Sequence, residues 1–228
     1  MSDANNPFDP VPLAPPNFQP RCPCLLLLDT SSSMKGKPID ELNAGVTQLY
    51  DSLVGDLVAS DRVELAIVTF GKGDVEVLQT FLNPKPGQCP TLTVDGYTPM
   101  AAAIQRGLDL LDARLNALKM EGLKLYKPWV VLITDGAPTD GAAAMEAAIA
   151  RVHDAQAKNR LVFWAFGVQG ADMKVLSQLG GMHAMMLDSA NFRALFDWIS
   201  ASLSAVSRSA PGGSVQLGPP PNTFTITV

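Results

Sequence analysis

The order of apolar and polar residues along this chain alternates between two patterns. Short continuous apolar runs indicate strands buried on both faces of a sheet, whereas apolar residues repeated every three or four positions indicate helices with one buried face. The predicted strands span residues 25–28, 61–70, 75–82, 129–134, 161–168 and 183–187. The predicted helices span residues 39–57, 100–118, 142–158, 172–179 and 192–203. Such an alternation is typical of a doubly wound α/β fold.

Two of the predicted strands follow each other too closely for a helix to lie between them. Residues 71–74 read Gly-Lys-Gly-Asp, which predicts a turn, so the strands on either side pair as an antiparallel hairpin. We therefore expect an α/β, Rossmann-like sheet of six mostly parallel strands, with one antiparallel edge strand and helices on both faces.

The two ends of the chain differ in composition from its middle. Residues 1–21 are rich in proline and predict an extended arm, while residues 22–205 can bury the core of one domain. Residues 206–228 begin as a Ser/Gly/Pro linker. They end in the alternating, β-branched stretch 223–228, which predicts a strand that adds to a sheet edge of this chain or of a partner. A disordered terminus is the alternative.

Polar residues at alternate positions follow the first predicted strand. They are Asp29, Ser31 and Ser33, and in an open α/β sheet the loops at the carboxyl ends of the strands hold ligands. The aspartate supplies charge and the serines supply neutral oxygens, a set that suits a hard cation such as Mg²⁺. The motif predicts a metal site in this loop.

Two further segments carry oxygen ligands in comparable places. Thr98 precedes Pro99, which suits the first turn of the following helix, so Thr98 is the expected N-cap. Asp135 follows the predicted strand 129–134. We expect the side chains from these three loops to converge.

In these motifs the chain resembles a von Willebrand factor type A (VWA) domain over residues 22–205. Five residues match the metal-ion-dependent adhesion site (MIDAS) of that family: Asp29, Ser31, Ser33, Thr98 and Asp135. The resemblance implies that the hydroxyls contact the metal directly and that the aspartates often act through water. The implied cofactor is Mg²⁺, with Mn²⁺ or Ca²⁺ as alternatives. The implied function is a non-catalytic protein-binding module whose cation captures a Glu or Asp of a partner protein.

A narrower resemblance rests on the segments beside these motifs. Arg21-Cys22-Pro23-Cys24 and the segment from Gly96 to Pro99 are most similar to bacterial TerY-like proteins of tellurium-resistance and stress-response systems. This similarity implies a stress-response assembly, with a kinase and a phosphatase as partners.

One residue departs from the metal motif of the family. Ser32 stands where the family most often has glycine, a residue that adopts positive φ without steric cost. Ser32 removes no ligand, but it makes the conformation of the loop an open question. Met34 and Lys35 follow it and are candidates for a binding rim.

Composition excludes several other classes of function. A net charge of −5 and a pI near 4.9 argue against nucleic-acid binding, which normally needs a basic face. The apolar runs are far shorter than the roughly 20 residues of a membrane span, and the first residues do not resemble a secretion signal. We therefore expect a cytoplasmic protein without nucleic-acid or membrane partners.

The cysteines indicate neither a zinc site nor a disulfide framework. Cys22, Cys24 and Cys89 make an odd number and lack Cys-x-x-Cys spacing. The favoured interpretation is that they pack as small buried side chains. A redox or soft-metal role for Cys22 and Cys24 is the alternative.

Two enzyme classes compete with the binding module. Asp29 at the end of an apolar strand resembles the nucleophile of haloacid-dehalogenase-like phosphatases, but those enzymes need a second aspartate where this chain has Ser31. A nucleotide enzyme would need a glycine-rich phosphate loop, and neither common form of it occurs in the sequence.

Overall fold

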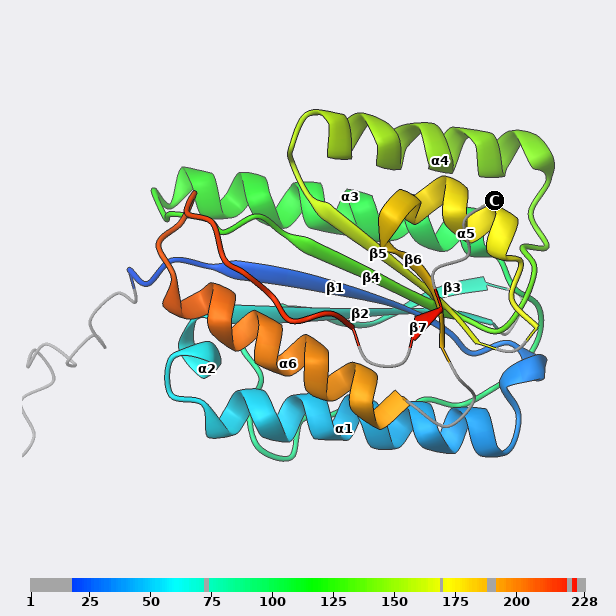
Figure 1. The fold of residues 1–228 in the computed structure, drawn as a ribbon, viewed down its shortest axis with the longest axis horizontal. Helices are drawn as coiled ribbons and strands as arrows, with labels where there is room; N and C mark the ends of the chain where they lie inside the picture. Colours follow the sequence, from blue (N-terminus) through cyan, green and yellow to red (C-terminus); the bar gives the residue numbers. More distant parts are fainter. Residues whose placement is uncertain (1–17, 72–73, 169, 188–191, 221–222, 225–228) are drawn as a thin grey trace, which may run out of the picture.

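One central sheet with helices on both faces forms the framework of the protein (Figure 1). A computed structural model describes residues 18–71, 74–168, 170–187, 192–220 and 223–224. Most of the predicted arm, the middle of the predicted turn and the last four residues of the predicted tail strand lie outside the described residues.

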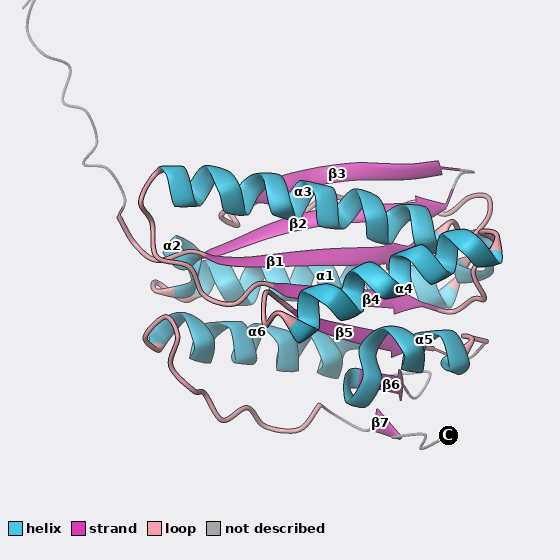
Figure 2. Ribbon diagram, turned by 90° about the horizontal axis from the view of Figure 1, so that it is seen from above, coloured by secondary structure: helices cyan, strands magenta, loops and turns pink. Residues whose placement is uncertain are grey.

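The sheet contains the six expected strands, and the first two residues of the predicted tail strand add a seventh at its edge. Its order is β3-β2-β1-β4-β5-β6-β7, which Figure 2 shows from above. The strands are β1 (Cys22–Asp29), β2 (Val63–Gly71), β3 (Asp74–Leu82), β4 (Trp129–Thr134), β5 (Val162–Gly167), β6 (Ala184–Leu187) and β7 (Thr223–Phe224). β3 pairs antiparallel with β2 at one edge, as expected, and β7 pairs antiparallel with β6 at the other. All other neighbouring strands are parallel.

The helices form a layer on each face of the sheet. The helices are α1 (Lys37–Gly55), α2 (Ala59–Arg62), α3 (Met100–Met120), α4 (Ala142–Ala157), α5 (Met173–Gly180) and α6 (Phe192–Arg208). In Figure 1, α3, α4 and α5 lie above the sheet, and α1, α2 and α6 lie below it. The doubly wound α/β fold is therefore confirmed.

The core consists of two apolar layers that share the central strands. On β1, Leu25 and Leu27 pack on the side of α3 and α4, while Leu26 and Leu28 pack on the side of α1 and α6. All four leucines are completely buried. A strand covered on both faces has no solvent side, which explains the uninterrupted apolar run in the sequence.

Several boundaries differ from those expected: β1, for example, begins at Cys22 and not at residue 25. Two of the differences are explained by hydrogen bonds between side chains and backbone groups. The short helix α2 occupies the start of the expected strand 61–70, since the carboxylate of Asp56 accepts the N–H groups of Val58 and Ala59. Helix α6 continues to Arg208 beyond the expected end at 203. Its last turn is held by Arg62 and Tyr126, which donate to the carbonyl of Ser207.

The cysteines of β1 are packed within the core. Cys22 and Cys24 are both fully buried. Burial, with a smaller contribution from Glu64, raises the pKa of the Cys22 thiol to about 12, and burial also raises the pKa of Cys24. Because the thiolate is the reactive form, the arrangement favours the packing interpretation over a redox or soft-metal role.

Close packing between α1 and α6 depends on the glycine at position 45. A Cβ built on Gly45 would lie 2.2 Å from Cδ2 of the fully buried Phe196. We expect Gly45→Ala to lower the free energy of unfolding by about 1–3 kcal/mol through overpacking.

Gly55→Ala in the same helix is the matched control for this prediction. No atom lies within 4 Å of a Cβ at Gly55, so this change should raise stability by about 0.5–1 kcal/mol through helix propensity. Urea unfolding of both variants measures the difference. Equal effects of the two substitutions would contradict the packing described for α6.

Candidate functional site

The candidate site lies where the winding of the sheet reverses direction. From β1 the chain passes to β2 on one side, and it later adds β4 on the other side of β1. The carboxyl ends of β1 and β4 therefore border the crevice at which doubly wound folds hold ligands. Asp29 is the last residue of β1, and Asp135 directly follows β4. Because Leu28 pairs with Ile133, the two aspartates come to the same edge of the sheet.

Hydrogen bonds bring the two serines of the first loop to both aspartates. The N–H of Ser31 donates to Oδ1 of Asp29 at 2.8 Å, and the Oγ atoms of Ser31 and Ser33 are 2.9 Å apart. Ser33 Oγ then donates to Oδ1 of Asp135 at 2.7 Å. One chain of contacts thus joins the loop after β1 to the loop after β4.

Thr98 joins the same group of side chains. It is 6% exposed, and its Oγ1 lies 3.3 Å from the position that a Cβ on Gly136 would occupy. Oδ2 of Asp29 lies 3.9 Å from that position. The missing side chain of Gly136 leaves room between the threonine hydroxyl and the carboxylate. The structure therefore brings all five sequence-predicted residues together.

The expected capping role of Thr98 was wrong. The N-cap of α3 is Pro99, and the carboxylate of Asp140 accepts the free N–H groups of Ala101 and Ala102 at 2.9 and 3.2 Å. Because Asp140 belongs to the loop after β4, it caps a helix that is distant in sequence. Because Asp140 caps the helix, the hydroxyl of Thr98 stays available to the site.

Sequence reasoning missed Thr134 as a residue that orients the site. Its Oγ1 donates to Oδ2 of Asp29 at 2.5 Å. With the N–H of Ser31 on Oδ1, both oxygens of Asp29 accept a hydrogen bond. Thr134 is the last residue of the otherwise apolar strand β4, and this isolated hydroxyl was the available signal.

The two aspartates place negative charge in a poorly solvated region. Asp29 is completely buried and Asp135 is 8% exposed. Burial is the largest cause of the raised pKa of each carboxyl, and Asp135 raises the pKa of Asp29 further. Among the described residues, no cation contributes to either pKa. A divalent cation would supply the missing positive charge.

The donor set fits a hard cation by its chemistry as well as its charge. Three hydroxyls and two carboxylates are all oxygen ligands, the type preferred by Mg²⁺, Mn²⁺ and Ca²⁺. In the described parts of the chain, no three His, Cys, Asp or Glu side chains form a metal-binding group of their own. The set of five oxygen donors around the ends of β1 and β4 is the candidate metal centre because of its own chemistry.

The loop accommodates Ser32 without backbone strain. Among the described residues, the sole non-glycine residue with positive φ is Asn159, so Ser32 has negative φ. Ser32 starts a short 3₁₀ turn that ends at Met34.

Met34 is fully buried, so the expectation that it forms part of a binding rim was wrong. Lys35 is exposed beside the turn. Tyr97, next to Thr98 in the sequence, is 71% exposed.

Comparisons with known proteins agree with this architecture. The model of the von Willebrand factor type A domain matches residues 25–200. A search of the curated proteins gives no match.

Among the helices of the described residues, none is both long and apolar enough to cross a membrane.

Similar solved structures share the fold at low sequence identity. The vWF domain of the pilus tip protein Mfa5 from Porphyromonas gingivalis has a TM-score of 0.65 at 12% identity, covering 87% of this chain and 99% of that one. The pilus adhesin SpaC from Lactobacillus rhamnosus GG has a TM-score of 0.66 at 15% identity, covering 82% and 30%. Manganese-loaded TRAP protein from Plasmodium vivax has a TM-score of 0.53 at 22% identity, covering 79% and 74%.

Proposed function

Because the chain belongs to the von Willebrand factor type A family, whose members typically mediate protein–protein interactions, we propose that it is a metal-dependent protein-binding module. The oxygens of Ser31, Ser33 and Thr98 would hold a divalent cation together with Asp29 and Asp135. When bound, the cation supplies an open coordination position for a carboxylate of a partner protein.

The observation that carries this proposal is a pair of buried carboxylates for which the described residues supply no compensating cationic side chain. Asp29 and Asp135 lie at one sheet edge with hydroxyls between them. Direct ligands that are mostly neutral leave a cation with enough positive charge to attract a further carboxylate. Mg²⁺ is the proposed physiological ion, and the manganese-loaded TRAP structure supports a divalent ion of this type.

The surroundings of Asp29 favour binding over catalysis. As a nucleophile in phosphotransfer, this carboxylate would have to present an oxygen to the substrate. Instead it is completely buried, and Ser31 and Thr134 each donate to one of its oxygens. Ser31 also stands where such an enzyme needs its second aspartate. The proposed module is therefore non-catalytic.

The proposed setting follows from the narrower resemblance of the sequence. We place the module in a bacterial tellurium-resistance or stress-response system in the cytoplasm, where a partner would present Glu or Asp to the metal. A kinase or phosphatase of the same system is the proposed partner. The motifs around Cys22 and Gly96 support this assignment.

Capture of a partner from native lysate tests the proposed function. We expect the immobilised chain to retain a protein in Mg²⁺ and to release it in chelator. Ser33→Ala removes an exposed hydroxyl of the site and should weaken both Mn²⁺ binding, measured by calorimetry, and partner capture by about tenfold.

Ser52→Ala is the matched control for this experiment, because Ser52 is an exposed serine on α1 away from the site. It should bind Mn²⁺ and partner as the unchanged chain does. Capture that persists in chelator, or equal Mn²⁺ affinity in both serine variants, would refute the proposed function.

A further inference from the structure

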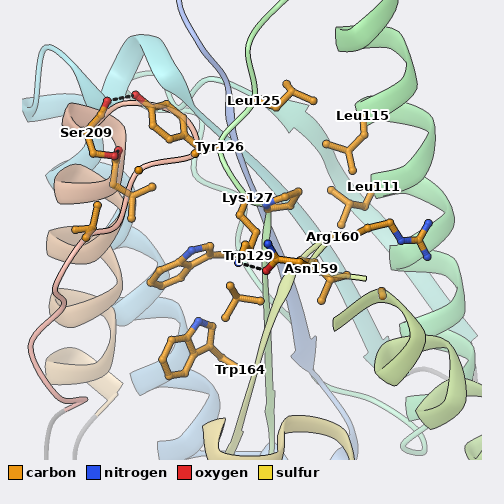
Figure 3. Close-up of a pocket in the computed structure, with 18 of the residues that line it drawn as sticks. Leu111, Leu115, Leu125, Tyr126, Lys127, Trp129, Asn159, Arg160, Trp164 and Ser209 are labelled. Atoms are coloured by element: carbon orange, nitrogen blue, oxygen red, sulfur yellow. Dashed lines mark hydrogen bonds between the residues drawn. The ribbon is translucent and has the colours of Figure 1, made fainter. Parts of the chain in front are cut away.

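A second concave site lies at the end of the sheet opposite the aspartates. It is a cavity of about 1140 Å³ around the amino ends of β4 and β5, a size sufficient for an organic ligand. Figure 3 shows Trp129 and Trp164 on one side of the cavity and Leu111, Leu115 and Leu125 on the other. The lining thus offers flat aromatic surface and aliphatic surface to one occupant.

Within the described parts of the chain, one buried hydrogen-bond donor of this lining has no acceptor. Nε1 of Trp164 is buried without a partner among the described residues, and the side chain is 8% exposed. The ring is held in place by Trp129, Trp198 and His183, whose ring centroids lie 5.5, 4.9 and 4.3 Å away. In contrast, Nε1 of Trp198 donates to the carbonyl of Gly218 at 2.7 Å. A buried N–H group is normally satisfied, and an acceptor on a ligand in the cavity would satisfy this one.

The charge around the cavity favours an anionic ligand. Four basic residues and one acidic residue line it, although the whole chain has a net charge of −5. The lining charges belong to Lys119, Lys127, Arg151, Arg160 and Asp112. Both arginines form ion pairs with aspartates, whereas Lys127 donates to the neutral amide of Asn159. The positive charge of Lys127 is therefore not neutralised by that contact.

The segment after α6 forms one wall of the cavity and is tied down on both sides of it. At one end, the hydroxyl of Tyr126 shares its one proton between the carbonyl of Ser207 and that of Ser209, which lies 2.6 Å away; Figure 3 shows the contact with Ser209. At the other end, Trp198 donates to Gly218. Between these two hydrogen bonds, five residues of the segment line the cavity: Gly212, Gly213, Ser214, Val215 and Leu217. The segment would thus cover an occupant and separate part of it from solvent.

From these contacts we propose that the cavity binds a small organic anion with a flat ring system. The rings would lie against Trp129 and Trp164, the acid group would accept the N–H of Trp164, and Lys127 would favour its negative charge. This site is separate from the candidate metal centre and does not require a bound cation.

Anilinonaphthalene sulfonate and its neutral analogue phenylnaphthylamine are the probes that test this proposal. Both become fluorescent on burial, but only the first carries an acid group. We expect the sulfonate to bind saturably at one molecule per chain in the presence of chelator. Trp164→Phe, which keeps a ring but removes the N–H, should weaken sulfonate binding by about tenfold and leave phenylnaphthylamine binding unchanged.

Lys127→Gln provides a second variant at an exposed position, where a failure to fold is not expected. It should weaken the binding of the sulfonate but not that of the neutral probe. Lys85→Gln, an exposed lysine outside the cavity lining, should change neither. Near-ultraviolet circular dichroism checks that each variant is native, because partly folded chains bind the sulfonate nonspecifically. Absence of saturable binding, or equal affinities in all three variants, would overturn the proposal.

Discussion

Asp29→Asn is expected to abolish the stabilisation of this protein by Mg²⁺. A ligand that binds only the folded chain at about 100 times its dissociation constant stabilises it by about 2.7 kcal/mol. For a domain of this size, that gain raises the unfolding temperature by roughly 5–10 °C. Without the charge of Asp29 the shift should disappear, and thermal unfolding with and without Mg²⁺ measures it.

The metal-free Asp29→Asn chain should be at least as stable as the unchanged protein. Asparagine keeps the shape of the side chain and can still accept the N–H of Ser31, while it removes a charge that burial and Asp135 both disfavour. Asp40→Asn, an exposed carboxylate on α1, is the control and should retain the full Mg²⁺ shift. If Asp29→Asn kept the same shift as Asp40→Asn, the assignment of the metal centre would be wrong.

Glu64→Ala should cause the largest loss of stability. Glu64 is 2% exposed and receives two hydrogen bonds from Arg114 at 2.7 and 2.8 Å. Arg21 lies 3.3 Å from the same carboxylate. Removing one partner of a buried ion pair leaves poorly solvated charge uncompensated, at a cost of about 3–5 kcal/mol. Urea unfolding should show this loss.

Glu41→Ala is the matched control for Glu64→Ala. Glu41 pairs with Lys37 at 3.3 Å on the solvent side of α1, and the lysine side chain is 75% exposed. Exposed pairs of this type contribute about 0.3–0.5 kcal/mol. Similar losses in both variants would show that Glu64 does not act as a buried charge.

Most of the fold was predictable because strands and helices leave periodic signals in the sequence. β4 spans residues 129–134 as expected, since a strand buried on both faces requires a continuous apolar run. The start of β2 and the end of α6 were not predictable in this way. They depend on the bonds of Asp56 and Tyr126 to backbone groups, and those bonds leave no periodic pattern.

The residue types of the candidate site were determined by the sequence itself. An apolar strand that ends in Asp29 and is followed by Ser31 and Ser33 specifies both an edge of the sheet and a set of oxygen donors. The same local logic identified Asp135, whereas Thr98 was identified through an expected N-cap role that was wrong. Ser31 stands where a phosphotransfer enzyme of this type would need its second aspartate, which disfavours that alternative.

Only the tertiary structure decided how those donors are held and what else surrounds them. Thr134 donates to Asp29 across 105 positions of sequence, and Asp140 caps α3 from a different loop. The cavity beside Trp164 is built from strands, helices and the segment after α6. Contacts of this kind depend on which strands become neighbours, and that choice is made by packing of the whole core rather than by any local pattern.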